Sequence, residues 1–272
     1  AWEQLGGDIY GLASHDDFGK SLALSADGRT LVVGAPQSQV VVPWYNSDGT
    51  LYYSTHDSTG QFRVFGWNNL TATLDWTQIG DTVDGERSDW SGWSVDISAD
   101  GKIVAVGAKY SKKNDNAGQV KVYEYDDFAM GWNQLGSSIV GEDENDASGH
   151  SVALSSDGLT VAIGAPANGG NGFSSGHVRV YKWVDSEWSQ VGQDINGRNA
   201  GDEAGHAVAL SADGSTLAVG SPYNDGNGAN SGMVQAYQWN DNSYDWAPLG
   251  KEIWGEADAD QSGQAVALSA DG

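Results

Sequence analysis

Two sequence markers recur along this chain with a common period, and this repetition constrains the fold more than any other feature. One marker is a Trp followed, three residues further on, by an aliphatic residue and then Gly; the other is Ser-x-Asp-Gly. Both return about every 57 residues, which is the size of a repeated supersecondary unit. The Trp residues are Trp2, Trp76, Trp132, Trp188 and Trp246, and the Asp residues are Asp27, Asp100, Asp157, Asp213 and Asp271.

The pattern of each repeat predicts four short strands. In the third unit, residues 149–155 alternate apolar and small side chains, residues 160–166 are almost wholly apolar, and residues 177–183 and the segment from Trp188 complete the set. Ser-x-Asp-Gly predicts a tight turn, because Gly tolerates positive φ and Asp bonds its own backbone. Four antiparallel strands per unit are typical of a propeller blade, with a β-solenoid as the alternative.

We therefore expect an all-β fold, a β-propeller of four-stranded antiparallel blades in a single domain, 1–272. Four blades would be complete and strands of a further one present in part. An unpaired strand edge is unfavourable, so we also expect the natural chain to continue into part of another blade. The expected blades cover residues 19–80, 92–136, 149–192 and 205–250, and the partial strands lie in 1–10 and 255–272.

Three segments of the first unit resemble the FG-GAP repeat of integrin α-subunit propellers. They are Phe18-Gly19-Lys20-Ser21-Leu22-Ala23, Val32-Val33-Gly34-Ala35-Pro36 and Gly60-Gln61-Phe62-Arg63-Val64-Phe65. Residues 149–181 and 205–237 are similar, whereas the second unit has Lys109 in place of the Pro. The resemblance implies a seven-bladed ring, of which this chain would be a fragment, used in extracellular adhesion. It also implies calcium in the turn after the first strand, but Ser-x-Asp-Gly is too short to surround an ion.

The charge balance excludes several classes of partner. Lys and Arg number 13 against 37 Asp and Glu, which gives a net charge of −24. Too few basic residues remain to neutralise a phosphate backbone or an anionic membrane, so we expect no nucleic-acid partner. The absence of Cys excludes disulfides and thiolate sites. The longest apolar runs are too short for a membrane span.

Acidic and amide side chains gather in the connections between units and between the second and third strands. Carboxylate and amide oxygens suit calcium, so calcium is the one cofactor expected here. The alternative is that the repeated Asp caps a turn in each unit. The candidate metal ligands are Asp143, Asp146, Asp225, Asn227, Asp258 and Asp260.

Aromatic residues that break the repeat are the candidate binding residues. Trp90, Trp93 and Trp254 lie in the connections between units, where a lectin could stack them on a sugar. The insertion 37–58 reads as a protruding hairpin that contacts a partner, or else folds onto its own blade. Its aromatic residues are Trp44, Tyr45, Tyr52 and Tyr53, and a glycosylation sequon begins at Asn69.

The motifs of common hydrolases and zinc enzymes are absent from the sequence. His150 and His206 share a repeat position that holds Lys20, Trp93 and Gln264 elsewhere, which indicates a groove or a channel and not a shared ligand. We expect a secreted or cell-surface, non-catalytic adhesion, scaffold or matrix module that binds extracellular proteins or glycans, or itself. The alternatives are a calcium-assisted glycan-binding lectin and a propeller-based polysaccharide hydrolase or lyase.

Overall fold

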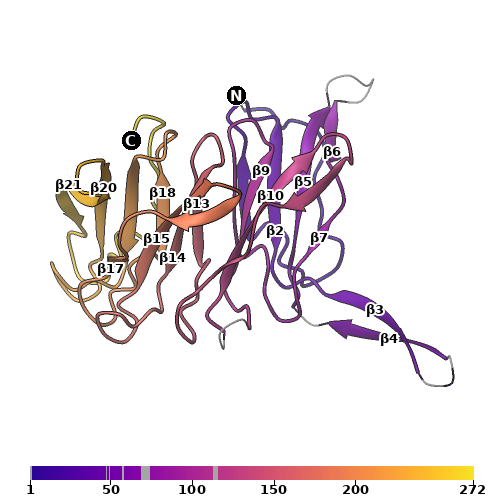
Figure 1. Cartoon of the computed structure of the whole chain (residues 1–272), viewed down its shortest axis with the longest axis horizontal. Coiled ribbons are helices and arrows are strands. Elements are labelled where there is room, and N and C mark those ends of the chain that lie inside the picture. The colour runs from indigo at the N-terminus through magenta and orange to yellow at the C-terminus, as the bar shows by residue number, and fades with distance from the viewer. Residues whose placement is uncertain (1, 47, 49, 57, 69–73, 113–115) are drawn as a thin grey trace.

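A computed structural model describes residues 2–46, 48, 50–56, 58–68, 74–112 and 116–272, and those residues contain strands and no helix (Figure 1). The first sheet comprises β1 (Ser21–Leu24), β2 (Thr30–Ala35), β5 (Gln61–Asn68), β6 (Asp75–Gln78) and β7 (Val83–Asp84). The second sheet comprises β8 (Ser94–Ile97), β9 (Ile103–Ala108), β10 (Gln119–Asp126), β11 (Gly131–Gln134) and β12 (Ile139–Val140).

Two further sheets repeat the same order along the chain. The third comprises β13 (Ser151–Leu154), β14 (Thr160–Ala165), β15 (His177–Val184), β16 (Glu187–Gln190) and β17 (Ile195–Asn196). The fourth comprises β18 (Ala207–Leu210), β19 (Thr216–Ser221), β20 (Met233–Asn240) and β21 (Asp245–Trp254). All paired strands are antiparallel, as the alternating patterns predicted. Each sheet extends a few residues past the expected blade bounds, because β7, β12, β17 and the end of β21 lie beyond them.

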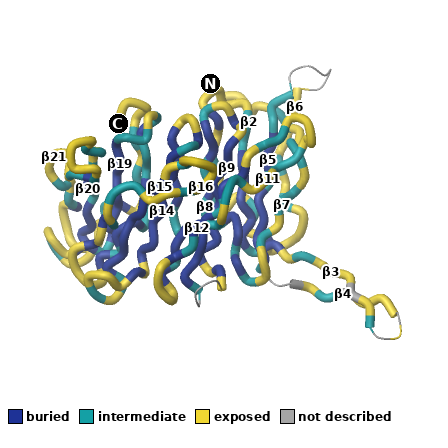
Figure 2. The backbone as a smooth tube through the Cα atoms, in the orientation of Figure 1, coloured by how far each residue is buried: buried dark blue, intermediate teal, exposed yellow. Residues whose placement is uncertain are grey.

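The apolar second strand of each unit forms the centre of its sheet. Every residue of β9, β14 and β19 is buried, which agrees with their near-continuous apolar sequence. Side chains of successive sheets pack face to face, so that Val120 and Val122 of the second sheet contact Val161 and Ile163 of the third. The buried residues consequently run through the interior of all four sheets (Figure 2).

Neighbouring sheets are joined at their inner edge by the turns after the first strands. The amide of Ala99 donates to the carbonyl of Ser156 at 2.8 Å, and the amide of Ser156 donates to the carbonyl of Ala212 at 2.8 Å. Within each turn the Ser hydroxyl donates to the Asp carboxylate, as Ser155 does to Asp157 at 2.6 Å. The repeated Ser-x-Asp-Gly therefore shapes a turn that also bonds to the next unit.

The outer edge is joined by the repeated Trp. The indole N–H of Trp132 donates to Ile79 O at 3.0 Å, and that of Trp188 donates to Leu135 O at 2.9 Å. Trp132 and Trp188 thus each lie in one sheet and bond to the backbone of the unit before it.

Two of the expected strands do not form. The described residues 2–10 and residues 264–269 carry no strand, since neither segment has a ladder partner in the described part of the chain. No closed sheet joins the first unit to the last in the described structure. In this part of the chain there is also no helix long and apolar enough to cross a membrane.

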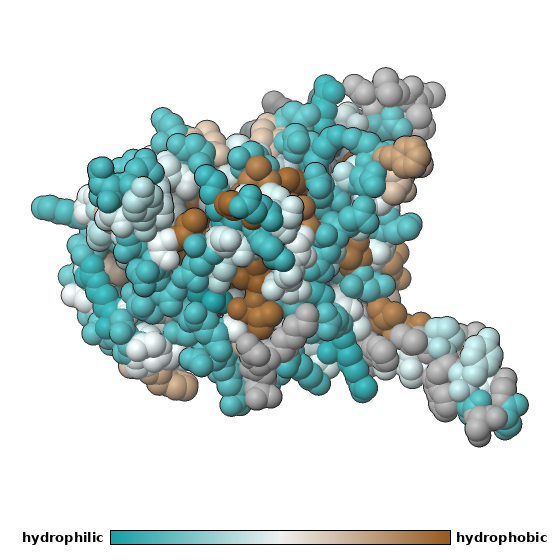
Figure 3. Space-filling view, viewed as in Figure 1, coloured by the Kyte–Doolittle hydropathy of each residue, from teal (hydrophilic) through white to brown (hydrophobic). Residues whose placement is uncertain are grey.

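The insertion forms the expected hairpin. Strands β3 (Val40–Tyr45) and β4 (Leu51–His56) pair only with each other and extend away from the body of the molecule (Figure 1). The alternative, in which this segment folds onto its own blade, is not what the structure has. The face shown in Figure 3 is mostly hydrophilic, in keeping with the acidic composition.

Gly164 tests the contact between sheets. A methyl group at this position would come within 2.9 Å of the carbonyl carbon of Gly205, and closer still to its oxygen. Gly164→Ala should therefore lower the free energy of unfolding by about 2–4 kcal/mol, measured by urea denaturation. Gly131→Ala is the matched control, because a methyl group there meets no atom within 4 Å. Equal stability of the two variants would contradict this account of the junction.

Removal of the hairpin tests its independence from the core. Because β3 and β4 pair with no other strand, replacing residues 37–58 by a short Gly-Asn linker should leave the fold intact. We expect a melting temperature within a few degrees of the parent by circular dichroism, and an unfolded deletion variant would show that the hairpin belongs to the core.

Candidate functional site

Rings from three successive units meet where the inner strands begin. Trp93, His150 and His206 each directly precede an inner strand, namely β8, β13 and β18. The ring centroids of Trp93 and His150 lie 5.8 Å apart, and those of His150 and His206 lie 4.7 Å apart. The repeat position that varies in sequence is thus the position whose side chains converge.

Two lysines place their ammonium groups over one of these rings, that of Trp93. Lys109 follows β9, is only 8 % exposed, and places Nζ 3.2 Å from the centroid of the Trp93 ring. Lys20 precedes β1 and places Nζ 4.5 Å from the same centroid. Both are cation–π contacts, which stabilise a charge that has lost part of its hydration. We call Lys20, Trp93, Lys109, His150, Glu203 and His206 the inner cluster.

Burial changes the protonation of two members of the cluster. It lowers the pKa of Lys109 to about 8, with Lys20 adding repulsion and Glu203 opposing it. Burial, with further repulsion from Lys109, lowers the pKa of His150 to about 3, so its imidazole is neutral at neutral pH. Groups with such shifts in one place are typical of functional sites.

His206 is oriented by a carboxylate. Its Nδ1 lies 3.3 Å from Glu203 Oε2, and a proton on Nδ1 leaves Nε2 as an acceptor. Glu203 also lies near enough to Lys109 to raise that pKa. The cluster thus combines an oriented imidazole, a second neutral imidazole and ammonium groups, which are the parts needed for proton transfer and for binding of an anion.

Asp96 lines a cavity between the inner strands. A cavity of about 210 Å³ is lined by the inner-strand ends and following turns of five repeats, including Leu24, Asp96, Leu154 and Leu210. Asp96 lies in β8, where the other units have Ala, and its Oδ2 accepts from the amide of Leu154 at 2.6 Å. Burial raises the pKa of Asp96 to about 6.

The structure brings two of the predicted binding aromatics to the inner cluster. Trp90 lies 5.9 Å from Trp93 and 4.9 Å from Tyr110 between ring centroids, next to Lys109. Trp254 lies in another place, where its indole packs against Gly226 in the fourth unit. The predicted set therefore does not form one site.

Two of the predicted binding residues of the hairpin are exposed to solvent. Tyr45 is 69 % exposed and Tyr52 is 45 % exposed. The side chains of Trp44 and Tyr53 lie outside the described residues, and so does Asn69. Their roles stay predictions.

The predicted calcium ligands form hydrogen bonds within their own loops and to neighbouring loops. Asp146 is 1 % exposed and accepts from the amide of Asp143 at 2.9 Å and from Asn168 Nδ2 at 3.1 Å. Asp260 accepts from the amide of Ala257 at 2.7 Å. Exposed members bond likewise: Asp225 accepts from Asn230 N, Asp258 accepts from Ala229 N, and Asn227 donates to Gly255 O. Calcium binding by these residues stays a prediction.

Sequence reasoning missed Lys109 and Glu203. Lys109 was noted only as a departure from the repeat, although the departure was the signal: three units end the second strand with Pro, and this one ends it with a lysine. Glu203 lies in one of the acidic connections between units, and nothing in the sequence distinguishes it from its acidic neighbours. The packing of separate units brings Lys109 and Glu203 together, so no contiguous motif contains both.

Residues 82–123 match the family model described as the FG-GAP repeat. This chain contains an FG-GAP repeat. The matched segment includes β8 and β9 and ends within β10, and it carries Trp90, Trp93 and Lys109. The resemblance drawn from the sequence is confirmed for this unit. No curated protein matches the chain.

Solved structures share the fold at low sequence identity. A provisionally named 6-phosphogluconolactonase from Bacteroides uniformis is 12 % identical with a TM-score of 0.51, over 89 % of this chain and 86 % of that one. The periplasmic gluconolactonase of Pseudomonas aeruginosa is 16 % identical with a TM-score of 0.49, over 86 % of this chain and 71 % of that one. The FG-GAP repeat here is thus built into a β-propeller architecture.

These names correct the expected function. The prediction of a non-catalytic adhesion, scaffold or matrix module was wrong, and so was the prediction that the chain is not an enzyme, because a structure with the same fold is named as a lactonase. The error came from a search for contiguous motifs. The inner cluster brings together residues of several units, and a search for contiguous motifs does not detect such a set.

The titration of Asp96 gives a prediction about stability. Its pKa in the folded protein lies above that of an unfolded Asp, so the folded state favours the neutral form and stability is lost as the pH rises from about 4 to about 6. Relative to the parent, Asp96→Asn should gain about 2 kcal/mol between pH 4 and pH 8 in urea unfolding. An unchanged difference at the two pH values would contradict the raised pKa.

Proposed function

We propose that this chain is a hydrolase-type β-propeller that opens cyclic esters of acidic sugar derivatives at the inner cluster. The observation that carries the proposal is the meeting of Lys109, His150 and the His206–Glu203 pair where the inner strands begin. The name of the Bacteroides uniformis structure supports it at the level of the fold. A propeller-based hydrolase was also among the alternatives that the sequence left open.

The charges of the cluster favour an anionic substrate. The protein as a whole carries −24, so an anion is repelled by most of its surface. Lys20 and Lys109 place two ammonium groups beside one Trp ring, and they offer an anion a local positive site. Trp90 and Tyr110 add apolar ring surface, which suits the C–H face of a sugar ring.

Hydrolysis at this site needs only water as the second reactant. Nε2 of His206 accepts a proton from water, while Glu203 holds the opposite nitrogen. The water oxygen bonds to the ester carbonyl carbon, and the ammonium of Lys109 stabilises the negative oxygen that forms. The ring C–O bond then breaks, and the proton on His206 passes to the leaving alkoxide, which yields the open hydroxy acid.

Several features remain proposals beside this one. A seven-bladed closed ring, calcium in the loops between units, extracellular partners and a secreted or cell-surface location all stay predictions from the sequence. None of them is required for the chemistry described above.

Lys109 provides the sharpest test of the function. Its ammonium loses its proton as the pH rises through about 8, so kcat/KM for an anionic lactone should fall above that pH. Lys109→Met should lower kcat/KM about 100-fold, because one oxyanion contact is typically worth this much. Lys109→Arg should keep part of the activity and move the alkaline limb upward. The assay is proton release from a panel of sugar-acid lactones against a pH indicator.

The control is a lysine in another place. Lys102 is ion-paired with Asp127 on the surface, so Lys102→Met should leave the lactonase rate unchanged. His206→Gln should remove most of kcat, because it removes the nitrogen that accepts the proton from water. No hydrolysis of any lactone by the folded protein, or equal rates in Lys109→Met and Lys102→Met, would overturn the proposal.

A further inference from the structure

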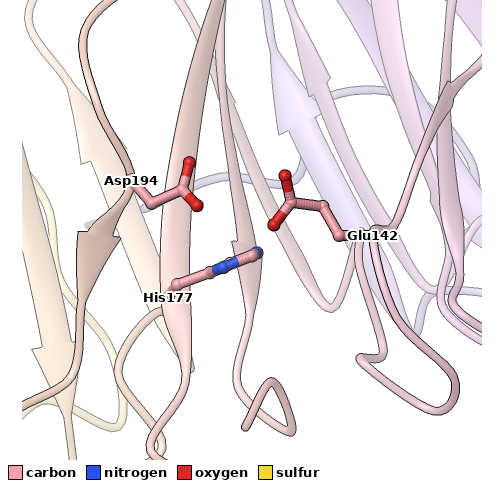
Figure 4. A group of neighbouring side chains, drawn as sticks. All are labelled: Glu142, His177 and Asp194. Carbon is pink, nitrogen blue, oxygen red and sulfur yellow. The ribbon is translucent and has the colours of Figure 1, made fainter. Parts of the chain in front are cut away.

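Two carboxylates and an imidazole meet at the corner between the second and third sheets. Glu142 follows β12, His177 is the first residue of β15, and Asp194 directly precedes β17. Each offers one ligand atom, and these atoms all lie within 4.8 Å of one another. Figure 4 shows the His177 ring directed toward the space between the two carboxylates.

His177 is a buried polar group without a partner. Its side chain is 1 % exposed, and Nε2 has no hydrogen-bond partner in the described structure. A buried polar atom in that condition costs free energy, which an ordered water or a bound ion would recover. Burial, with repulsion from Arg179, lowers the pKa of His177, which keeps the imidazole in the neutral form that ligates metals.

The carboxylates are partly committed to neighbours and keep further coordinating capacity. Glu142 Oε1 lies 3.3 Å from Arg179 Nη1, and Asp194 Oδ1 accepts from Gln190 Nε2 at 2.7 Å. A carboxylate has two oxygens and several acceptor positions, so each can still bind a cation. Asp143 and Asp146 also lie close enough to His177 to raise its pKa, against the larger effects of burial and Arg179.

The other units do not repeat this set. At the equivalent corner of the second unit, Gln119 replaces His177, Ser138 replaces Asp194, and Glu86 is ion-paired with Lys121 at 2.8 Å. The fourth unit has Met233 at the His177 position and pairs Arg198 with Glu252. A residue found in every unit serves the fold, whereas a set found in one unit alone calls for a local explanation.

The structure assigns Glu142, His177 and Asp194 as the protein ligands of a divalent transition-metal ion, for which Zn²⁺ is the best match. One imidazole nitrogen and two carboxylate oxygens form a mixed set that Zn²⁺ accepts readily, whereas Ca²⁺ and Mg²⁺ prefer oxygen alone. Three protein ligands leave a fourth position for water. Glu142 lies in the connection between two units, so the ion fastens that connection to the third sheet.

This metal site is separate from the inner cluster. His177 begins the third strand of its unit, whereas His150 and His206 precede inner strands. The inference therefore does not rest on the proposed lactonase activity, and the test uses binding and not catalysis.

The experiment is a titration of chelator-treated, full-length protein with ZnCl2 by calorimetry, and with CoCl2 by visible absorption. We expect one tight equivalent of Zn²⁺ and Co²⁺ absorption bands in the range of four- to five-coordinate sites, with no competition from excess Ca²⁺. His177→Gln introduces the residue that the second unit has, and Asp194→Asn changes a less buried ligand. Each should weaken Zn²⁺ binding at least about tenfold.

Glu86→Gln is the matched control, since Glu86 occupies the Glu142 position of the second unit, and it should bind Zn²⁺ like the parent. Melting curves without metal establish that every variant is folded. Gln119 Oε1 at the equivalent corner is also without a partner, so an ordered water is the competing occupant. Absence of a Zn²⁺ equivalent would favour that water and overturn the assignment, as would parent-like binding by both His177→Gln and Asp194→Asn.

Discussion

The close approach of glycine to glycine between neighbouring sheets is the contact on which the rest of this structure depends. The Gly of the Gly-Ala-Pro segment in each unit lies against the Gly that precedes the inner strand of the next unit. Gly34 meets Gly92, Gly107 meets Gly149, Gly164 meets Gly205 and Gly220 meets Gly263. No side chain fits there, so both glycines of the repeat are explained by one distance. The turn-to-turn amide bonds and the Trp indole bonds then fix the angle between sheets from the inner and outer edges.

A junction this close determines where variation is tolerated. The residue after the second Gly varies between units, and it is Lys20, Trp93, His150, His206 or Gln264. The rigid junction holds these unlike side chains at short, fixed spacings, which lets burial and mutual repulsion shift their pKa values. The repeat therefore supplies the scaffold, and the departures from the repeat supply the chemistry.

The fold could be predicted well from the sequence because the same local turn and strand signals recur in each unit. Ser155, Asp157 and Gly158 define a turn by their own chemistry, and the apolar run of β14 identifies a central strand. The short strands β7, β12 and β17 escaped notice, since two residues carry no periodicity. The proposed metal site was harder to predict from the sequence. His177 looks like an ordinary strand residue in sequence, and Glu142 and Asp194 lie 35 positions before and 17 after it, so only the packing of two sheets brings them together.

The hairpin β3–β4 shows how such a protein can change its reach without changing its framework. In the first unit β2 and β5 pair from Thr30 with Gly66 to Ala35 with Gln61, and in the third β14 and β15 pair from Thr160 with Lys182 to Ala165 with His177. The two ladders have the same length and register, although far more chain separates the strands of the first. Added residues at this connection do not enter the ladder. Evolution can therefore lengthen, shorten or replace the segment at the end of the sheet where the inner cluster lies, and the junctions between units are unaffected.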